Sequence, residues 1–408
     1  MIAEFFDGLR RLAAPEKKQS AAAGLVSLHL TGQPYWTPRN YGALAREGYA
    51  ANPIAFRCVR ALADAAASMP LVLYEGDREL TNHPLLDLLT RPNPLQAGQE
   101  LLATAYSHLQ IAGNSYLEVV SVGDDVKELY VLRPDRMKVV PGARGWPEAY
   151  EYSVSGRTHR FKVEGETSPI LHLKTFNPTD DHYGHSAIEA AAPAIDIYNQ
   201  GGAWLKALLD NAARPSGALV YRGPVGAPNL TADQFDRLKA ELEENYQGAK
   251  NAGRPLLLEG GLEWQSLSFS PSDLQFLDAR NASAREIALA FGVPPMLLGI
   301  PGDNTYSNYR EANLAFWRMS VLPLVNRTLE SLSGWLGPRF GGELGEPLRL
   351  GVDLDGVEAL TLEREALWAR VEAASFLTRD EKREAVGYGA SGEEETDKQP
   401  QPLRAVSE

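Results

Sequence analysis

Cysteine is nearly absent from this sequence. Cys58 is the single cysteine among 408 residues, which excludes an internal disulfide and leaves no set of thiolates for zinc or an iron–sulfur cluster. We expect Cys58 to be a small buried apolar residue. Long hydrophobic runs are also missing, since no stretch reaches the roughly 20 apolar residues that cross a bilayer. The start, MIAEFFDGLRR, lacks the apolar block of a signal peptide, so we expect synthesis in the cytoplasm and no membrane contact.

The sequence also has a deficit of positive charge. It carries 40 Lys and Arg against 53 Asp and Glu, a formal net charge of −13. A protein that clamps nucleic acid by neutralising phosphates needs a surplus of Lys and Arg on the contacting face, so this balance argues against such a clamp. The negative net charge is still compatible with a protein past which DNA moves without adhering. Acidity alone is equally ordinary in soluble enzymes.

Motifs of the common enzyme classes are missing as well. The sequence contains no GxxxxGK[ST] loop to cradle phosphates, and no GxSxG or HExxH motif. We therefore predict that the chain is not an enzyme, has no catalytic residue, hydrolyses no nucleotide and needs no cofactor.

One cluster has metal-ligand residue types. Asp180, Asp181, His182 and His185 lie close together in TDDHYGHSAIE. Two histidines near carboxylates could hold a metal, but a site needs three or four convergent ligands and no distant Cys or His partner is evident. A turn before a helix cap explains the same residues, and we expect no metal. The acidic stretch from Asp353 fails the 12-residue spacing of a calcium loop and is better explained as a strand exit.

The length exceeds what one hydrophobic core usually serves, so two or more packed units are expected. Residues 1–49 show no sustained period and suggest a peripheral arm. Asn52 can cap a helix that starts at Pro53, and a strand, LVLYEG, follows it. A helix over 97–112 and strands at SYLEVVSV, KELYVL, MKVV, YEYSV, HRFKV and SPILHLK complete an expected α+β domain.

Long helices dominate from residue 186. Ser186 and Glu189 form a capping box for a helix to about 212, in which Pro193 marks a kink or a restart. A small α/β insert over 213–269 follows, with a helix capped by Thr231 and Gln234 between strands ALVYRG, PLLLEG and LEWQSLSF. Further helices are predicted over 270–291, 307–335 and 357–376, with the strand PLRLGVDLD before the last. The polar end is expected to be disordered.

Several segments resemble portal proteins of long-tailed phages and gene-transfer agents. The most extended runs from Pro271 to Val325 and includes AREIALAFGVPPMLLG. RPNP, AGNSYLEVV, LRPDRMKVV, YGHSAIEAAAPAI, KNAGRPLLLEGG and FLTRDEKREAVG match in the same order. Taken singly, each is a helix end or a turn. Their joint order over about residues 50–390 carries the resemblance.

The resemblance implies a portal fold assembled as a closed ring, typically of twelve subunits. By order along the chain, 1–49 is an N-terminal arm, 50–185 resembles the wing, and 186–212 and 270–291 resemble the two stem helices. The insert at 213–269 then takes the place of the clip and 292–306 that of the tunnel loop. A wing helix and return strand would occupy 307–356, and 357–408 the crown and a disordered tail.

The implied function is structural. A ring at one capsid vertex would admit and release double-stranded DNA, and would dock the terminase large subunit, a head–tail adaptor and the major capsid protein. Such a protein is located in the virion after its synthesis in the cytoplasm of the bacterial host.

The implied site is the channel. We expect Asp303, Asn304, Thr305 and Tyr306 nearest the DNA. The apolar residues Met296, Leu297, Leu298 and Ile300 are expected to pack at the base of the loop or against the next subunit. A connector without DNA contact is the alternative. Arg280, Arg285 and Arg310 are candidates either for weak DNA contacts in the channel or for ion pairs with a neighbouring subunit, and the second is favoured because Arg suits interface pairs.

Two rival functions belong to other classes. A packaging enzyme such as a terminase is opposed by the missing phosphate loop and the missing cluster of acidic metal ligands. A different virion component, from the capsid or baseplate, is opposed only by the family resemblance.

Overall fold

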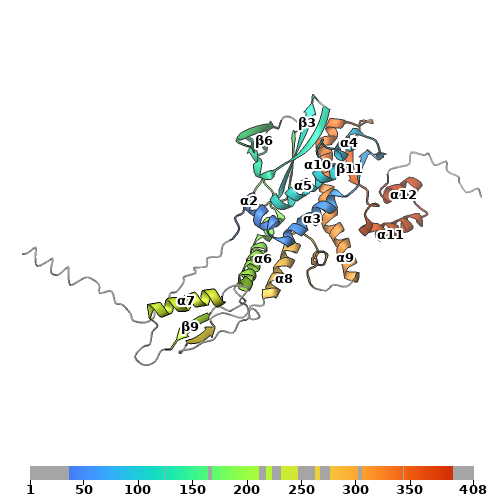
Figure 1. The fold of residues 1–408 in the computed structure, drawn as a ribbon. Coiled ribbons are helices and arrows are strands. Elements are labelled where there is room, and N and C mark those ends of the chain that lie inside the picture. The colour runs from blue at the N-terminus through green and yellow to red at the C-terminus, as the bar shows by residue number, and fades with distance from the viewer. Residues whose placement is uncertain are drawn as a thin grey trace, which may run out of the picture. The chain divides into compact units, whose positions relative to one another are not determined.

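The computed structural model describes residues 36–123, 125–163, 168–210, 217–222, 231–246, 262–266, 276–301, 306–342 and 344–388 (Figure 1). The chain divides into two compact units, one of 1–35 with 204–274 and one of 36–203 with 275–408. Both units mix helices and strands, as the α+β prediction requires. No described helix is long and apolar enough to cross a membrane.

The larger unit begins with helical turns that the sequence pattern did not reveal. Residues Tyr41–Ala43 (α2) and the π-helical turn Leu44–Ala50 (η1) follow Asn40, whose side chain accepts a hydrogen bond from Ala43 N. Ala43 and Leu44 are buried. The expectation of a purely peripheral arm is therefore wrong for these residues. A π turn disrupts the 3.6-residue period by which helices are recognised, which explains why the pattern is missing.

Helix α3 (Pro53–Ala67) forms where its capping residues predict it. Asn52 Oδ1 accepts hydrogen bonds from the backbone N–H groups of Ile54 and Ala55, at 3.0 and 2.9 Å, and Pro53 occupies the first turn. Cys58 lies on the buried face with none of its surface exposed, as predicted. Burial raises the pKa of its thiol to about 12, so the group stays protonated and unreactive.

Three antiparallel sheets belong to the same unit. The first has the order β11-β1-β2 and joins β1 (Leu71–Glu75) to β2 (Arg78–Leu80) and to β11 (Leu348–Val352). The second, β4-β3-β8, is built from Asp125–Leu132, Asn114–Val122 and Ile170–Lys174. The third, β5-β6-β7, is built from Met137–Pro141, Pro147–Val154 and Arg157–Lys162, and the short helix η2 (Pro134–Arg136) precedes it. The pairing of β1 with β11 closes the unit across most of the chain.

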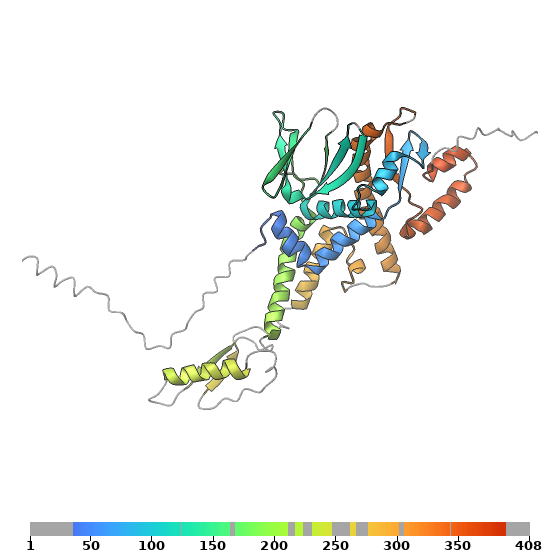
Figure 2. The same ribbon diagram turned by 45° about the horizontal axis from the view of Figure 1, so that its top comes forward.

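Helices cover these sheets and make the core. Helix α5 (Gly98–Ala112) ends at Gly113, which has φ 69°, and packs against α3 and β3 (Figure 2). Short helix α4 (Pro84–Thr90) adds Leu85 and Leu89 to the same core. Neither α4 nor β2 was predicted, because each is too short to show a period. A smaller core of Tyr116, Met137, Tyr150 and Phe161 lies between the second and third sheets.

Helix α6 (Ala187–Asp210) contains Pro193 without ending there. Proline has no N–H, so the carbonyl of Glu189 loses its helical partner. Arg39 supplies the replacement, since its Nη1 donates to Glu189 O at 2.8 Å. Ser186 Oγ accepts from Glu189 N at 3.0 Å, as the predicted cap requires.

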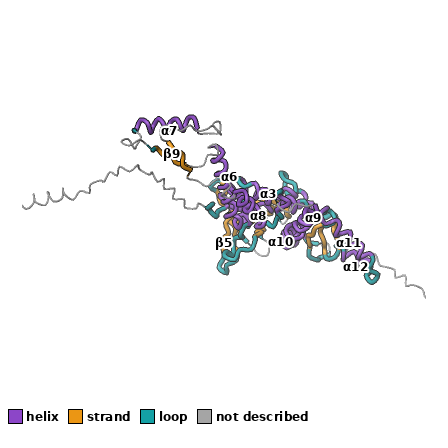
Figure 3. Tube along the Cα trace, turned by 90° about the horizontal axis from the view of Figure 1, so that it is seen from below, coloured by secondary structure: helices purple, strands orange, loops and turns teal. Residues whose placement is uncertain are grey.

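The later helices differ from the predicted bounds. Helix α8 is described over Phe276–Ala290, and its expected cap at Ser270–Asp273 lies outside the described residues. Figure 3 shows α8 beside α3, on which it packs. The helix predicted over 307–335 comprises α9 (Tyr306–Phe316), a π turn (η5, Trp317–Val321) and α10 (Leu322–Phe340). The π turn comes just before Pro323, which lacks an N–H donor, and Pro338 near the other end does not stop the helix.

The last helical region is divided rather than continuous. The turn η6 (Glu358–Leu360) leads into α11 (Thr361–Glu372), which ends four residues before the predicted end at Phe376. Helix α12 (Arg379–Ala385) follows with a complete capping box between Thr378 and Glu381.

The smaller unit is described in three pieces. Strands β9 (Gly217–Tyr221) and β10 (Leu262–Ser266) pair antiparallel, and α7 (Ala232–Tyr246) lies between them in the chain. Thr231 and Gln234 form the predicted capping box, with N–H to oxygen distances of 3.0 and 3.4 Å. The predicted strand PLLLEG lies outside the described residues.

Candidate functional site

The segment from α8 to α9 contains the predicted tunnel loop. Helix α8 ends with Val293 N donating to Ala288 O at 2.9 Å, and Gly292 adopts φ 65°. A β-carbon at Gly292 would lie 2.8 Å from Ser320 Oγ, so both conformation and space favour glycine there. The 3-10 turn η4 (Pro295–Leu298) follows and ends at Gly299, with φ 71°.

The apolar residues of this segment anchor its base. Ile300 is 5% exposed, and Leu297 and Leu298 pack against the main core from partly buried positions. Met296 is half-buried. Of the two places predicted for this cluster, the structure shows the base of the loop for Leu297, Leu298 and Ile300.

Two side chains from neighbouring elements hold the segment. Ser320 Oγ, from the π turn η5, donates to Gly292 O at 2.6 Å, and Arg285 Nη2, from α8, donates to Pro301 O. Sequence reasoning did not single out Ser320, because a lone serine in a helical run carries no signal of a tertiary contact.

Of the four residues predicted nearest the DNA, the structure describes one. Asp303, Asn304 and Thr305 lie outside the described residues, and Tyr306 is the first residue of α9. The structure thus gives the two ends of the loop, at Pro301 and Tyr306.

The three candidate arginines differ in their surroundings. Arg280 Nη2 donates to Tyr198 Oη at 3.0 Å, and its guanidinium lies 4.6 Å from the centre of that ring, so it joins α8 to α6. Arg285 contacts Pro301, and exposed Arg310 lies 3.9 Å from the carboxylate of Glu311. The structure does not bring these three side chains into one cluster.

The cluster considered for a metal forms a turn. Asp180 Oδ1 accepts from the backbone N–H groups of His182 and Tyr183, at 2.7 and 3.0 Å. The hydrogen bond from His182 is the largest cause that lowers the pKa of Asp180. His185 Nδ1 lies 3.3 Å from Glu189 on the next turn of α6. Among the residues described, no group of three or more His, Cys, Asp or Glu could hold a metal.

Two of the family-like motifs meet in space. Gly113 from AGNSY faces Gly184 from YGHS so closely that a β-carbon on Gly184 would lie 2.1 Å from Gly113 O. Asn114 Oδ1 accepts from Gly184 N at 2.8 Å and bonds His172 Nε2 at 2.9 Å. Since Oδ1 can only accept, His172 carries its proton on Nε2. Desolvation lowers the pKa of His172 to about 3.

The RPNP motif has a comparable structural role. Asn93 Nδ2 donates to Leu129 O at 2.9 Å, and its Oδ1 accepts from Leu95 N at 2.9 Å. Leu129 N in turn donates to Pro92 O at 2.8 Å. The turn is therefore fastened to strand β4, which explains the asparagine between two prolines.

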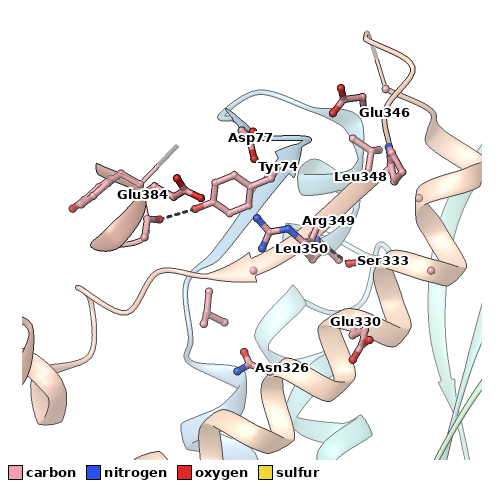
Figure 4. Close-up of a pocket in the computed structure, with 18 of the residues that line it drawn as sticks. Tyr74, Asp77, Asn326, Glu330, Ser333, Glu346, Leu348, Arg349, Leu350 and Glu384 are labelled. Atoms are coloured by element: carbon pink, nitrogen blue, oxygen red, sulfur yellow. Dashed lines mark hydrogen bonds between the residues drawn. The ribbon is translucent and has the colours of Figure 1, made fainter. Parts of the chain in front are cut away.

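A separate groove of about 1320 Å³ lies between β1, β11, α10 and α12 (Figure 4). Its acidic lining consists of Asp77, Glu330, Glu346, Asp380, Glu381 and Glu384. Arg349 supplies the basic side chain among the lining residues described, and it lies 4.7 Å from the centre of the Tyr74 ring. Ser333 Oγ donates a hydrogen bond to Leu329 O and accepts one from Leu350 N, so it is already satisfied by the chain itself. So many carboxylates disfavour a phosphate ligand.

Comparison with known proteins identifies the family. The family model for phage portal proteins matches residues 53–387. An uncharacterized protein of Rickettsia bellii is 43% identical over 346 residues, which cover 84% of this chain and 88% of that protein. The probable portal protein of Streptomyces phage phiC31 is 28% identical over 310 residues, or 71% of this chain and 66% of that protein.

A solved structure is similar as well. A chain in the neck of a native gene transfer agent (GTA) particle, computed with C12 symmetry, has 51% sequence identity and a TM-score of 0.66. The match covers 88% of this chain and 96% of that one. Because the family model spans most of the sequence, the chain belongs to the phage portal protein family, whose members are structural proteins rather than enzymes.

Proposed function

We propose that this chain is the subunit of a portal ring at one vertex of a phage or gene-transfer-agent capsid, through which double-stranded DNA enters and leaves. The observation that carries the proposal is the family match over residues 53–387. The 51% identity to a chain from a GTA particle neck supports a place in the virion.

The parts of the ring follow from the order of elements. We assign 50–185 to the wing, 186–212 and 270–291 to the stem, 213–269 to the clip, 307–356 to a wing helix and return strand, and 357–408 to the crown and tail. The described parts of 213–269 form a strand pair and a capped helix, which supports a small separate unit.

The charge of the chain suits a channel that DNA passes without adhering. Twelve copies, each with net charge −13, would carry −156 in all. Negative charge facing the channel repels phosphates, whereas a basic lining would bind them.

The loop over 292–306 is the proposed constriction. Its base is fixed by Ser320, Arg285 and buried Ile300, which leaves Asp303, Asn304, Thr305 and Tyr306 as the segment that reaches the DNA. Of the three arginines, Arg310 and Arg285 are exposed and remain candidates for contacts in the channel or with a neighbouring subunit.

The partners follow from the same function. We propose that a terminase large subunit and later a head–tail adaptor dock on the clip, and that the major capsid protein surrounds the wing. The terminase supplies the energy of packaging, because this sequence has no phosphate loop.

Electron microscopy and native mass spectrometry of the purified chain test the proposal. We expect pierced rings and a species of about 535 kDa, twelve times 44.6 kDa, or a neighbouring ring size. A well-folded chain that remains monomeric at high concentration would contradict the portal function and favour another capsid or baseplate role.

A further inference from the structure

The groove between β1, β11, α10 and α12 carries negative charge that its own chain does not neutralise (Figure 4). Within the described part of the chain, no hydrogen bond or ion pair engages the carboxylates of four lining residues: Asp77, Glu330, Glu346 and Glu384. Carboxylates that face the same solvent-filled space repel one another, so positive charge from outside the chain stabilises this arrangement.

The four carboxylates come from different walls of the groove. Asp77 lies in the turn between β1 and β2, Glu346 precedes β11, and Glu330 and Glu384 belong to α10 and α12. They do not converge as metal ligands do, since no group of three or more His, Cys, Asp or Glu in the described ranges could hold a metal. Negative charge spread around about 1320 Å³ fits a chain molecule with several cations better than one ion.

Arg349 shows which cation the groove accepts. Its guanidinium lies 4.7 Å from the centre of the Tyr74 ring, and Figure 4 shows its side chain beneath that ring. Such a contact between a guanidinium and an aromatic face is attractive. The chain therefore supplies one guanidinium itself, and an arginine from outside would compete with Arg349 for the same ring.

Glycines leave part of the wall without side chains. Nothing lies within 4 Å of a β-carbon placed on the lining residues Gly334, Gly341 or Gly345. Another main chain can approach closely at such positions. The groove thus combines separated carboxylates with an open wall, which suits a peptide.

The wall formed by α12 is fixed to the rest of the unit. Tyr74 Oη donates to Gly387 O at 3.2 Å, and Tyr388 Oη donates to Asp355 Oδ2 at 2.5 Å. Arg364 Nε donates to the other oxygen of Asp355 at 2.6 Å. These bonds form the groove before any ligand arrives, which lowers the cost of binding.

We propose that this groove binds a segment of another protein that is rich in lysine and arginine. Its cations pair with Glu330, Glu346 and Glu384, and one of its guanidinium groups takes the place of Arg349 on Tyr74. The same carboxylates disfavour nucleic acid and other phosphates. The inference goes beyond the portal function and does not require the ring, because every lining residue belongs to one copy of the chain.

Fluorescence anisotropy with the full-length protein provides the first test. The probe is the fluorescein-labelled peptide Arg-Ser-Lys-Gly-Arg-Ser-Lys, and a peptide with glutamate at every basic position should not bind. Glu330→Gln combined with Glu384→Gln should weaken binding by about 5- to 20-fold, because two ion pairs are lost. Glu47→Gln combined with Glu100→Gln removes the same charge at exposed positions outside the groove and should change binding less than about twofold.

Arg349 provides the second test. Arg349→Ala removes the competing guanidinium and should tighten binding of the same probe by about 2- to 5-fold. Arg349→Lys keeps a cation at the ring and is the matched control, with affinity near that of the wild type. Circular dichroism and the melting temperature check that each variant folds. Weaker or unchanged binding by Arg349→Ala would contradict the competition.

The outcomes separate this inference from the portal function. Equal weakening by the two glutamine pairs would show attraction to the acidic chain as a whole and overturn the groove as the site. Spermine that binds as tightly as the peptide would assign the groove to small polycations instead. Pierced rings that bind no peptide would refute the groove and leave the portal function standing, whereas peptide binding by a chain that forms no ring would do the reverse.

Discussion

Gly113 and Gly184 explain at the residue scale why two distant motifs belong together. Their backbones meet so closely that neither position has room for a β-carbon, and Asn114 bonds to Gly184 N and to His172 across the same contact. From the sequence, Gly113 could be recognised as a residue that ends a helix and Gly184 as a residue of a turn. It could not show that they touch, because a contact over some seventy residues leaves no periodic signal.

The first prediction concerns this contact. Gly184→Ala should lower the free energy of unfolding by about 1–3 kcal/mol, because its β-carbon would overlap the backbone at Gly113 O and at Thr175 N. Chemical denaturation of the purified chain measures the change. Gly202→Ala in α6, where nothing lies within 4 Å, is the control and should stabilise by about 0.5–1 kcal/mol. Equal effects of the two substitutions would contradict the contact.

The second prediction concerns pH. His172 has a pKa lowered to about 3 by desolvation, so the unfolded chain takes up a proton below about pH 6.5 while the folded chain does not. Stability is therefore full above pH 6.5 and falls as the pH drops toward the folded value, by at most about 2 kcal/mol between pH 7 and 5. His108, with a pKa lowered to about 4 chiefly by desolvation, contributes with the same sign.

Chemical denaturation of the wild type and of His172→Gln at pH 7 and pH 5 measures how much His172 contributes to the loss of stability on acidification. Glutamine keeps a donor for Asn114 but does not titrate, so the variant should lose less stability on acidification. Thr158→Gln, at an exposed position of β7 that does not titrate, is the control and should keep the wild-type dependence. An unchanged dependence in His172→Gln would contradict the buried neutral histidine.

At the scale of helices and strands, capping residues in the sequence predicted where most helices begin or end. Asn52 before α3, Gly113 after α5 and the box of Thr231 with Gln234 all act as the sequence predicts. The failures share a physical cause, since the π turns η1 and η5 change the helical period and α4 and β2 are too short to have one. Of the two predictions for Pro193, a kink or a restart, the restart is excluded, because Pro193 lies inside α6, where Arg39 satisfies the carbonyl that it frees.

The third prediction belongs to the loop between α8 and α9. Its base is held by Ser320, Arg285 and Ile300, so deletion of Gly302–Thr305 should spare the surrounding fold and ring assembly. In a packaging-competent particle the deletion should lower the amount of DNA retained, measured as protected DNA per capsid. Unchanged packaging and retention would remove the loop from the mechanism.

The fourth prediction belongs to the insert over 213–269. All of it lies in a separate compact unit with its own capped helix and strand pair, so replacing it with a short linker should leave ring formation largely intact. Terminase binding and tail joining should both be lost, as measured by pull-down and electron microscopy of particles. A trimmed ring that still packages DNA and joins tails would refute the clip assignment.

The class of the whole molecule was predictable from the order of its motifs. Absent catalytic motifs and the ordered segments from RPNP to FLTRDEKREAVG pointed to a portal protein, and the family match over 53–387 confirms that class. The closure of the larger unit by β1 and β11 was not predictable, since it joins strands some 280 residues apart. Sequence periodicity reports which face of an element is buried, and not which distant element buries it.

The fifth prediction concerns the whole chain. The purified ring should hydrolyse no ATP above background in a phosphate-release assay, because its sequence lacks a phosphate loop and its acidic groove disfavours phosphates. A terminase preparation serves as the positive control. Robust hydrolysis that a point mutation within this chain abolishes would overturn the structural role.

The attachment of Gly292 and Pro301 to separate helices has a mechanical consequence. A load applied between Pro301 and Tyr306 reaches α8 through Arg285 and the π turn η5 through Ser320. Hydrogen bonds loaded side by side share a force, whereas bonds loaded one after another each bear all of it. The hydrogen bond from Ser320 therefore couples the end of α8 to the π turn that separates α9 from α10.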